Sequence, residues 1–175
     1  MSVRTLDGLD GALALAGWTC ERSPKDHPAA AHTMLAWYWH CGELNLWASH
    51  VRGVGSYVLA EADGPGRWLW RVEIDGGTQE TVLRAAVAAM QYAGDEENDP
   101  GRVFGALVAA GWSLECGLDE VALCVLDPAG GTEVRNLPES AVDPGSWLVI
   151  RSEEAPTVAS AGTPADVVLA LADAV

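Results

Sequence analysis

Short segments with alternating hydrophobic and polar positions recur along the chain, and this alternation is typical of half-buried β-strands. The clearest case is 44–51, where small and leucine side chains alternate with polar or aromatic ones. Other segments are rich in valine, tryptophan and tyrosine, which favour strands. The predicted strands are 18–21, 33–40, 44–51, 57–62 and 68–74 in the first half, and 112–115, 121–126, 132–137, 147–152 and 157–161 in the second.

Two alanine- and leucine-rich stretches predict helices that end at Gly17 and Gly111. A glycine directly after the last helical turn is a common C-terminal cap, because it adopts a positive φ without strain. A tryptophan follows each of these glycines.

Two further helices are predicted behind Thr78 and Thr163. Threonine favours the N-cap position, proline favours the first helical position, and an acid completes a capping box. Thr163, Pro164 and Asp166 fit this pattern. The helix behind Thr163 is expected to place its apolar residues on one face; these are Val167, Val168, Leu171 and Val175.

The two halves of the chain resemble each other, since three matches occur in the same order in both. We therefore expect a first repeat at 1–93, an acidic linker at 94–101 and a second repeat at 102–175, all in one compact body. The matches are Gly11–Trp18 with Gly105–Trp112, Gly55–Leu59 with Gly145–Val149, and Gly77–Thr78 with Gly162–Thr163.

The predicted fold class is α+β. Each copy would be a helix, an antiparallel meander of four or five strands, and a closing helix. One such unit has a thin core, so we expect the two copies to pack together as a pseudo-twofold pair, with a pair of sheets. This arrangement looks like that of the Whirly and Pur-alpha proteins, whose sheets bind single-stranded nucleic acid.

The repeat also resembles the actinobacterial domain of unknown function 317, a family typical of Streptomyces with two copies per chain. The resemblance rests on the two Ala-Gly-Trp sites, the Gly-Thr-Pro-Ala-Asp segment at 162–166, and a few flanking prolines and tryptophans. The first copy departs from the family pattern, with Gln79 in place of the proline and Tyr57 in place of a tryptophan. The resemblance implies the two-copy fold and no particular activity.

The net charge of the chain limits the classes of partner that it is expected to bind. The chain of 175 residues has 10 Lys and Arg against 25 Asp and Glu, a net charge of −15. Such a protein is not expected to bind nucleic acid or anionic membranes through charge, because both need a basic surface. No apolar run reaches the length of about 18 residues that spans a bilayer, and no secretory signal is evident. Four cysteines without a CxxC pair read as reduced, half-buried residues, so we expect a cytoplasmic protein.

Residues with catalytic or metal-binding chemistry form no recognisable motif. His27, His32, His40, Cys41 and His50 lie close in sequence, but none of their spacings is that of a zinc site. The chain has neither a G-x-S-x-G nucleophile elbow nor a phosphate-binding loop. We therefore expect no metal, no cofactor and no enzymatic activity.

The tryptophans are the main candidates for a functional surface. Trp37 with Trp39, and Trp68 with Trp70, are each expected on one face of a strand, since residues i and i+2 share a side. An inward face would make them core, and an outward face would make an aromatic platform. Trp18, Trp112 and Trp147 are expected in the core in either case.

Two functions remain open at this point. The first is a non-enzymatic module that contacts a protein partner, or a second copy in a homodimer, through the tryptophan-bearing face. The second is a binder of single-stranded nucleic acid, in which arginines near the tryptophans form a local basic patch; the net charge opposes it. The candidate binding residues are Trp37, Trp39, Trp47, Trp68, Trp70, Arg52, Arg67 and Arg71.

Overall fold

The computed structural model describes residues 3–21, 37–51, 54–63, 67–75, 78–92, 99–116, 123–138, 141–152 and 155–173. The described residues form four helices and a ten-stranded sheet, so the α+β class is confirmed. None of these helices has the length and the apolar run that crossing a bilayer takes. The helices are α1 (Val3–Leu15), α2 (Gln79–Gln91), α3 (Pro100–Ala109) and α4 (Ala165–Leu171).

The strands lie close to where the alternation places them, and the strand predicted at 44–51 has the same bounds in the structure. The strands are β1 (Thr19–Glu21), β2 (Trp37–Cys41), β3 (Leu44–Val51), β4 (Val54–Ala62), β5 (Trp68–Asp75), β6 (Ser113–Cys116), β7 (Leu123–Leu126), β8 (Thr132–Asn136), β9 (Trp147–Arg151) and β10 (Thr157–Ala159).

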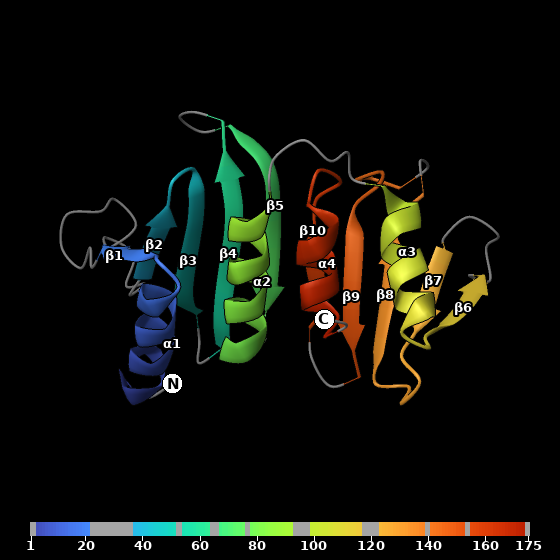
Figure 1. Cartoon of the computed structure of the whole chain (residues 1–175), viewed down its shortest axis with the longest axis horizontal. Coiled ribbons are helices and arrows are strands. Elements are labelled where there is room, and N and C mark those ends of the chain that lie inside the picture. The colour runs from blue at the N-terminus through green and yellow to red at the C-terminus, as the bar shows by residue number, and fades with distance from the viewer. Residues whose placement is uncertain are drawn as a thin grey trace.

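The strands form one continuous sheet in the order β1-β2-β3-β4-β5-β10-β9-β8-β7-β6, and each neighbouring pair is antiparallel (Figure 1). The expectation of a pair of sheets is therefore wrong. The meander β1–β5 joins the meander β6–β10 edge to edge, through the β5–β10 pairing of Val72 and Glu73 with Ala159 and Val158. Edge pairing satisfies backbone groups that two stacked sheets would leave open.

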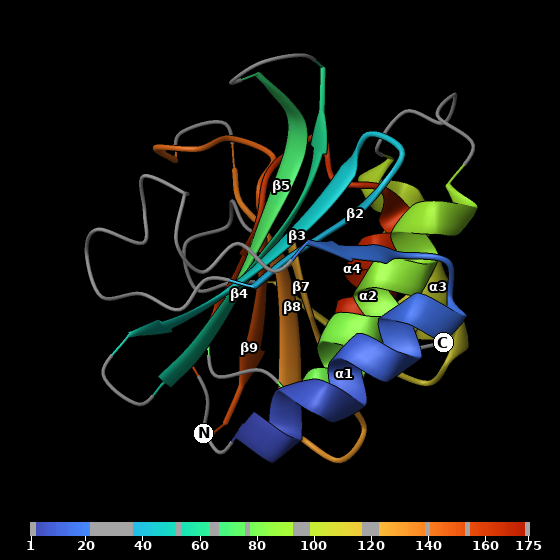
Figure 2. The same ribbon diagram turned by 90° about the vertical axis from the view of Figure 1, so that its left-hand side faces the viewer.

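All four helices lie on one face of the sheet, in the spatial order α1, α2, α4, α3 (Figures 1 and 2). The strand side chains that point toward the helices form the core. The core row that crosses β2 to β5 is fully buried and consists of Trp39, Leu46, Leu59 and Val72. Across the joint between the meanders the same row continues with Ala159 and Trp147, which are also fully buried.

The glycine caps of α1 and α3 are confirmed and have the same geometry. Gly17 has a φ of +98° and Gly111 a φ of +92°. Behind them, the Trp18 amide donates to the Leu13 carbonyl at 2.9 Å, and the Trp112 amide donates to the Leu107 carbonyl at 3.0 Å. This six-residue closure is the Schellman motif, which requires the left-handed conformation that glycine adopts most easily. Both Gly-Trp sites thus have one local structure.

The N-termini of the closing helices differ from each other. Thr78 caps α2, since its hydroxyl accepts a hydrogen bond from the Thr81 amide at 3.2 Å. The cap predicted at Thr163 is wrong, because Pro164 is the N-cap residue of α4 and has no side-chain hydrogen bond to offer. Proline holds an extended ψ of 142° there and lies outside the helix, so the helix starts one residue later than the pattern indicates.

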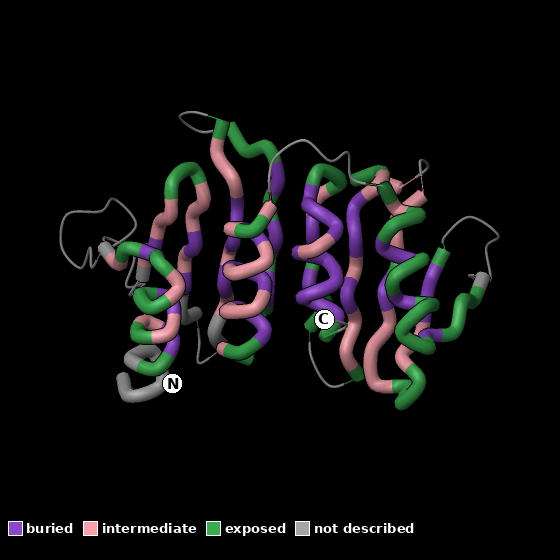
Figure 3. The backbone as a smooth tube through the Cα atoms, viewed as in Figure 1, coloured by how far each residue is buried: buried purple, intermediate pink, exposed green. Residues whose placement is uncertain are grey.

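Helix α4 is buried on almost every side, which corrects the expectation of a single apolar face. It lies between α2 and α3 and above the sheet, and Figure 3 shows purple along most of its length. Ala165 and every residue from Val167 to Leu171 are buried. Val175 lies outside the described residues. A helix that is apolar all round belongs in the centre of a protein rather than at its surface.

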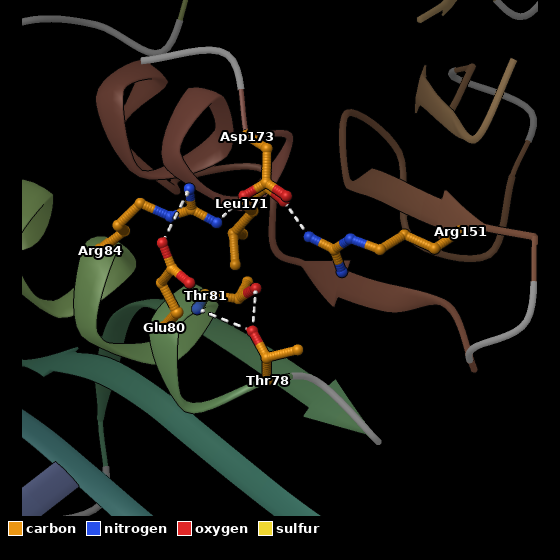
Figure 4. A network of polar contacts seen from close by, with 7 residues as sticks. All are labelled: Thr78, Glu80, Thr81, Arg84, Arg151, Leu171 and Asp173. Atoms are coloured by element: carbon orange, nitrogen blue, oxygen red, sulfur yellow. Dashed lines mark hydrogen bonds and ion pairs between the residues drawn. The ribbon is translucent and has the colours of Figure 1, made fainter. Parts of the chain in front are cut away.

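Polar side chains of α2 and β9 contact the C-terminal end of α4 (Figure 4). Arg84 of α2 forms an ion pair with Asp173, directly behind α4, and Arg151 of β9 donates to the Leu171 carbonyl. Asp173 has a positive φ of 61°, a conformation that aspartate tolerates better than most residues. The two halves of the chain therefore meet in the helix layer as well as in the sheet.

The segment between α2 and α3 was predicted as a linker at 94–101. Residues 93–98 lie outside the described part of the chain. Pro100 and Gly101 form the first turn of α3, and the Asp99 carboxylate caps it by accepting from the Gly101 amide at 2.8 Å. Proline in this first turn fits its usual place in helices.

Candidate functional site

The face of the sheet on which no described helix lies is called the open face here. Because directly opposed residues of antiparallel strands share a face, the register shows which side chains meet on it. One row runs from Tyr38 on β2 through Trp47 on β3 and Val58 on β4 to Glu73 on β5. This row lies one residue out of phase with the core row, so it points away from the helices.

Among the described residues, Tyr38, Trp47 and Trp68 bring their rings together on this face. The rings of Tyr38 and Trp47 have centroids 5.7 Å apart with an interplanar angle of 36°. The rings of Trp47 and Trp68 have centroids 5.2 Å apart and are nearly perpendicular, at 84°. Both separations lie in the range of favourable aromatic pairs. Tyr38, Trp47 and Trp68 are called the aromatic cluster below.

A bulge between β4 and β5 places Trp68 in this cluster. Glu61 pairs with Trp70 and Ala62 pairs with Trp68, so Leu69 is the extra residue of β5. An extra residue reverses the alternation locally and turns the next side chain to the other face. Trp68 is accordingly 40% exposed, while Trp70 is 2% exposed. The expectation that these two tryptophans share one face is wrong for this reason.

A shallow depression of about 250 Å³ lies at the aromatic cluster, lined by Trp47, Val58, Trp68 and Arg71. Ala60 on β4 is fully buried although its register places it on the open face between Asn45 and Arg71. A small side chain at this position leaves room for larger neighbours to cover it. The depression is therefore bounded mostly by indole and aliphatic surface.

The arginines near the cluster are paired with carboxylates. The Arg71 Nη2 atom lies 2.7 Å from Glu73 Oε1, and the Arg67 Nε atom lies 3.5 Å from Asp63 Oδ2. Arg52 lies outside the described residues. The two described arginines therefore bring no net positive charge to the aromatic cluster, although such pairs at the surface are weak and exchange readily with solvent.

The other tryptophans lie elsewhere. Trp39 and Trp70 are core residues, with their indole N–H groups donating to Asp10 at 2.8 Å and to Glu61 at 2.6 Å. Their assignment to a binding surface is therefore wrong. For Trp37 the structure describes the backbone in β2 and not the side chain. The expectation of core positions is confirmed for three more, Trp18, Trp112 and Trp147.

On the part of the open face formed by β6 to β10, Cys124 of β7 is the residue considered as a possible nucleophile. Its thiol donates to the Glu115 carbonyl at 3.2 Å, and Arg135 and Glu133 form an ion pair beside it. Burial, and then the negative charge of Glu133, raises the pKa of Cys124. Since the thiolate is the nucleophile, a raised pKa makes this cysteine a poor one. The hydrogen bond with Glu133 likewise raises the pKa of Arg135, which therefore stays charged.

The histidine and cysteine positions of the sequence do not come together in the described part of the chain. There, no group of three or more His, Cys, Asp or Glu residues could hold a metal ion. His40 stacks on Tyr38 with ring centroids 5.8 Å apart. Cys20 and Cys41 are half-buried and pack against the core. His27 and His32 lie outside the described residues.

The sequence pattern missed three members of this site. Tyr38 stands between two tryptophans and was not singled out, although the alternation of β2 puts it on the face opposite to Trp39. Val58 and Glu73 belong to the site only through their cross-strand register with Trp47. Strand alternation could have found Tyr38, whereas no local signal marks the other two.

No family model, curated protein or solved structure matches this chain.

Proposed function

We propose that the protein is a cytoplasmic, non-enzymatic interaction module that binds another protein through the aromatic cluster. The observation that carries this proposal is the partly exposed, perpendicular pair of Trp47 and Trp68 on the open face. Partly exposed tryptophans beside a shallow depression are typical of the few residues that supply most of the binding energy at protein interfaces.

The charge of the site favours a protein over a single-stranded nucleic acid. Stacked bases would suit the indole rings, but unspecific binding of a strand draws its affinity mainly from Lys and Arg contacts with phosphate. Arg71 is paired with Glu73, and the whole chain has a net charge of −15. Phosphates would therefore meet repulsion at long range and little compensation at the site.

The non-enzymatic part of the proposal rests on the chemistry of the titratable groups. Cys124, the buried thiol of the open face, is held protonated and bonded to a carbonyl. The carboxylates next to the aromatic cluster, Asp63 and Glu73, are engaged with arginines. Neither arrangement resembles a nucleophile with its base or an acid–base pair.

We also propose that the two halves of the chain are copies of one unit, as in the two-copy family that the sequence resembles. In support, each half has the element order helix, five strands, helix, and each opening helix ends in the same Gly-Trp closure. Only the first half carries the aromatic cluster, so the binding function would belong to one copy. A least-squares superposition that failed to bring Trp18 onto Trp112 would contradict this.

Site-specific photocrosslinking tests the protein-contact proposal. A benzoylphenylalanine placed at Leu69, which is 52% exposed on the bulge, should crosslink to a protein of the native host in growing cells. The adduct should disappear when Trp47 is also replaced by alanine. The same group at Val142, which is 98% exposed and far along the chain, serves as the control and should give no such adduct.

A gel-shift experiment tests the alternative. The purified protein should leave a labelled single-stranded oligonucleotide unshifted at micromolar concentration and physiological salt. A shift that weakens with salt and is lost in the Arg67→Glu, Arg71→Glu double variant would replace the protein-contact proposal with nucleic-acid binding.

A further inference from the structure

The side chains that line the depression at the aromatic cluster can donate hydrogen bonds but cannot accept them. Trp47 and Trp68 carry one indole N–H each, Arg71 carries guanidinium N–H groups, and Val58 has no polar atom. A group that fits there must offer apolar surface to the rings and acceptors to the donors. It should bring few donors of its own, because a donor left unpaired in a contact is costly.

Two kinds of ligand meet this requirement, and charge separates them. Anionic groups are pure acceptors, but the chain carries a net charge of −15 and the Glu73 carboxylate, 2.7 Å from the Arg71 guanidinium, neutralises its charge. The other guanidinium N–H groups can still donate to a neutral acceptor. Proline is the neutral alternative, since its ring is apolar, its carbonyl accepts, and it has no backbone N–H. The lining therefore matches a proline-containing segment.

The dimensions agree with such a segment. The depression of about 250 Å³ is smaller than the pockets of about 300–1,000 Å³ that enclose small-molecule ligands, so it suits one part of a longer chain. A polyproline II helix rises about 3.1 Å per residue, so two residues advance about 6 Å. The ring centroids of Trp47 and Trp68 are 5.2 Å apart, close to this advance, which lets two ligand residues two positions apart meet the two rings.

We propose that the aromatic cluster binds a proline-rich segment of the partner protein in the polyproline II conformation, with proline rings against Trp47 and Trp68 and a ligand carbonyl accepting from Arg71. This inference rests on the protein-contact function proposed above and names the chemistry of the partner. Aromatic-lined grooves recognise such segments because the ligand is already extended and loses little entropy on binding.

The partner is a different protein rather than a second copy of this chain. The nine prolines of the sequence are scattered, with no two adjacent and no two separated by two residues. A second copy therefore offers no run of polyproline II sequence for the cluster. The bound segment must come from elsewhere.

Titration calorimetry with a decaproline peptide tests the inference on the full chain. We expect saturable binding to the wild type, no binding of a glycine-serine peptide of equal length, and a loss of at least tenfold in affinity for Trp68→Ala. Arg71→Gln should weaken binding several-fold. Val158→Ala is the matched control, because Val158 is 39% exposed on the same face of the neighbouring strand β10, and it should bind as the wild type does.

The possible results separate the two proposals. An unchanged circular dichroism spectrum and a cooperative thermal transition must first show that Trp68→Ala is folded, and Trp47→Phe gives a second, milder variant for the same measurement. If decaproline does not bind the wild type at millimolar concentration, or binds Trp68→Ala equally well, the proline inference is wrong. In that case a crosslink that still depends on Trp47 would leave the protein-contact function standing.

Discussion

Strands β2 to β5 carry tryptophans on both faces of the sheet, and the two sets have different surroundings. On the helix side, Trp39 and Trp70 are buried and each donates its indole N–H to a carboxylate. On the open face, Trp47 and Trp68 pack edge to face against each other, and Trp68 keeps 40% of its surface in solvent. The same residue type thus serves the core on one side and supplies a contact surface on the other.

The comparison teaches that the solvent exposure of a tryptophan, rather than the number of tryptophans, distinguishes a binding site from a core. A buried indole N–H is most stable with a partner, and Asp10 and Glu61 supply one for Trp39 and Trp70, whereas the buried N–H groups of Trp18 and Trp147 have none. The open-face pair borders a shallow depression instead. A substitution on the helix side should therefore mainly lower the stability of the protein, whereas one on the open face should mainly weaken binding.

The largest effect is expected from Trp39→Ala. Removing a fully buried tryptophan leaves a cavity, and the Asp10 carboxylate loses its donor, so the free energy of unfolding should fall by about 3–5 kcal/mol. Trp68→Ala should cost about 1 kcal/mol, largely the lost ring pair. Urea unfolding of both variants measures the difference. Equal losses would contradict the division into a core face and a contact face.

The next effect concerns the bulge that turns Trp68 outward. A Cβ at Gly162 would lie 2.8 Å from the Leu69 carbonyl oxygen, so Gly162→Ala must displace the backbone of the bulge. We expect a loss of about 1–3 kcal/mol in the free energy of unfolding, as in other overpacked sites. Gly105→Ala is the control, since a Cβ there meets nothing within 4 Å. A Gly162→Ala variant as stable as the wild type would show that the bulge needs no such support.

The helices that lie on the core face of the sheet can be tested through substitutions at their N-caps. Thr78→Val removes the hydroxyl that accepts from the Thr81 amide and should lower the free energy of unfolding by about 1 kcal/mol, while Thr78→Ser should restore it. Thr163→Val should cost less, because the Thr163 side chain caps no helix. Thermal unfolding of the three variants decides the matter. If Thr163→Val lowers the free energy of unfolding more than Thr78→Val does, Thr163 acts as an N-cap after all.

The smallest effect is a pH dependence on the core face. Burial raises the pKa of Tyr57 above its ordinary value of 10.0. The unfolded chain therefore loses this proton first, so the stability that Tyr57 contributes is present below pH 10 and declines as the pH rises above it. Tyr57→Phe should remove this part of the decline when urea midpoints at pH 8 and pH 11 are compared. Parallel declines in both proteins would contradict the assignment.

Local patterns were enough to predict most elements. The alternation in 44–51 and the glycines at 17 and 111 depend on neighbours within one strand or turn, and the structure confirms them. The cap at Thr163 failed although its signal is local, because a proline can stand before a helix as well as inside its first turn. A residue pattern alone does not distinguish these two positions.

The features that depend on how the strands pair with one another were not predictable. The bulge at Leu69 is a property of how β5 pairs with β4, and it reversed the face expected for Trp68. The joint between β5 and β10 brings together strands that are far apart in sequence. The single continuous sheet follows from that joint, so a pair of sheets was the natural but wrong expectation.

The joint has one more consequence. The two halves of the chain meet through β5 with β10 and through α2 with α4, and both contacts are noncovalent. The backbone amide of Arg71 donates to the Ser160 hydroxyl at 2.9 Å, and the Ser160 amide donates back to the Arg71 carbonyl at 2.8 Å. A chain cut between Tyr92 and Asp99 would keep every one of these contacts. We therefore expect fragment complementation, in which two separately expressed pieces reassemble and bring Arg71 back to its place beside the rings.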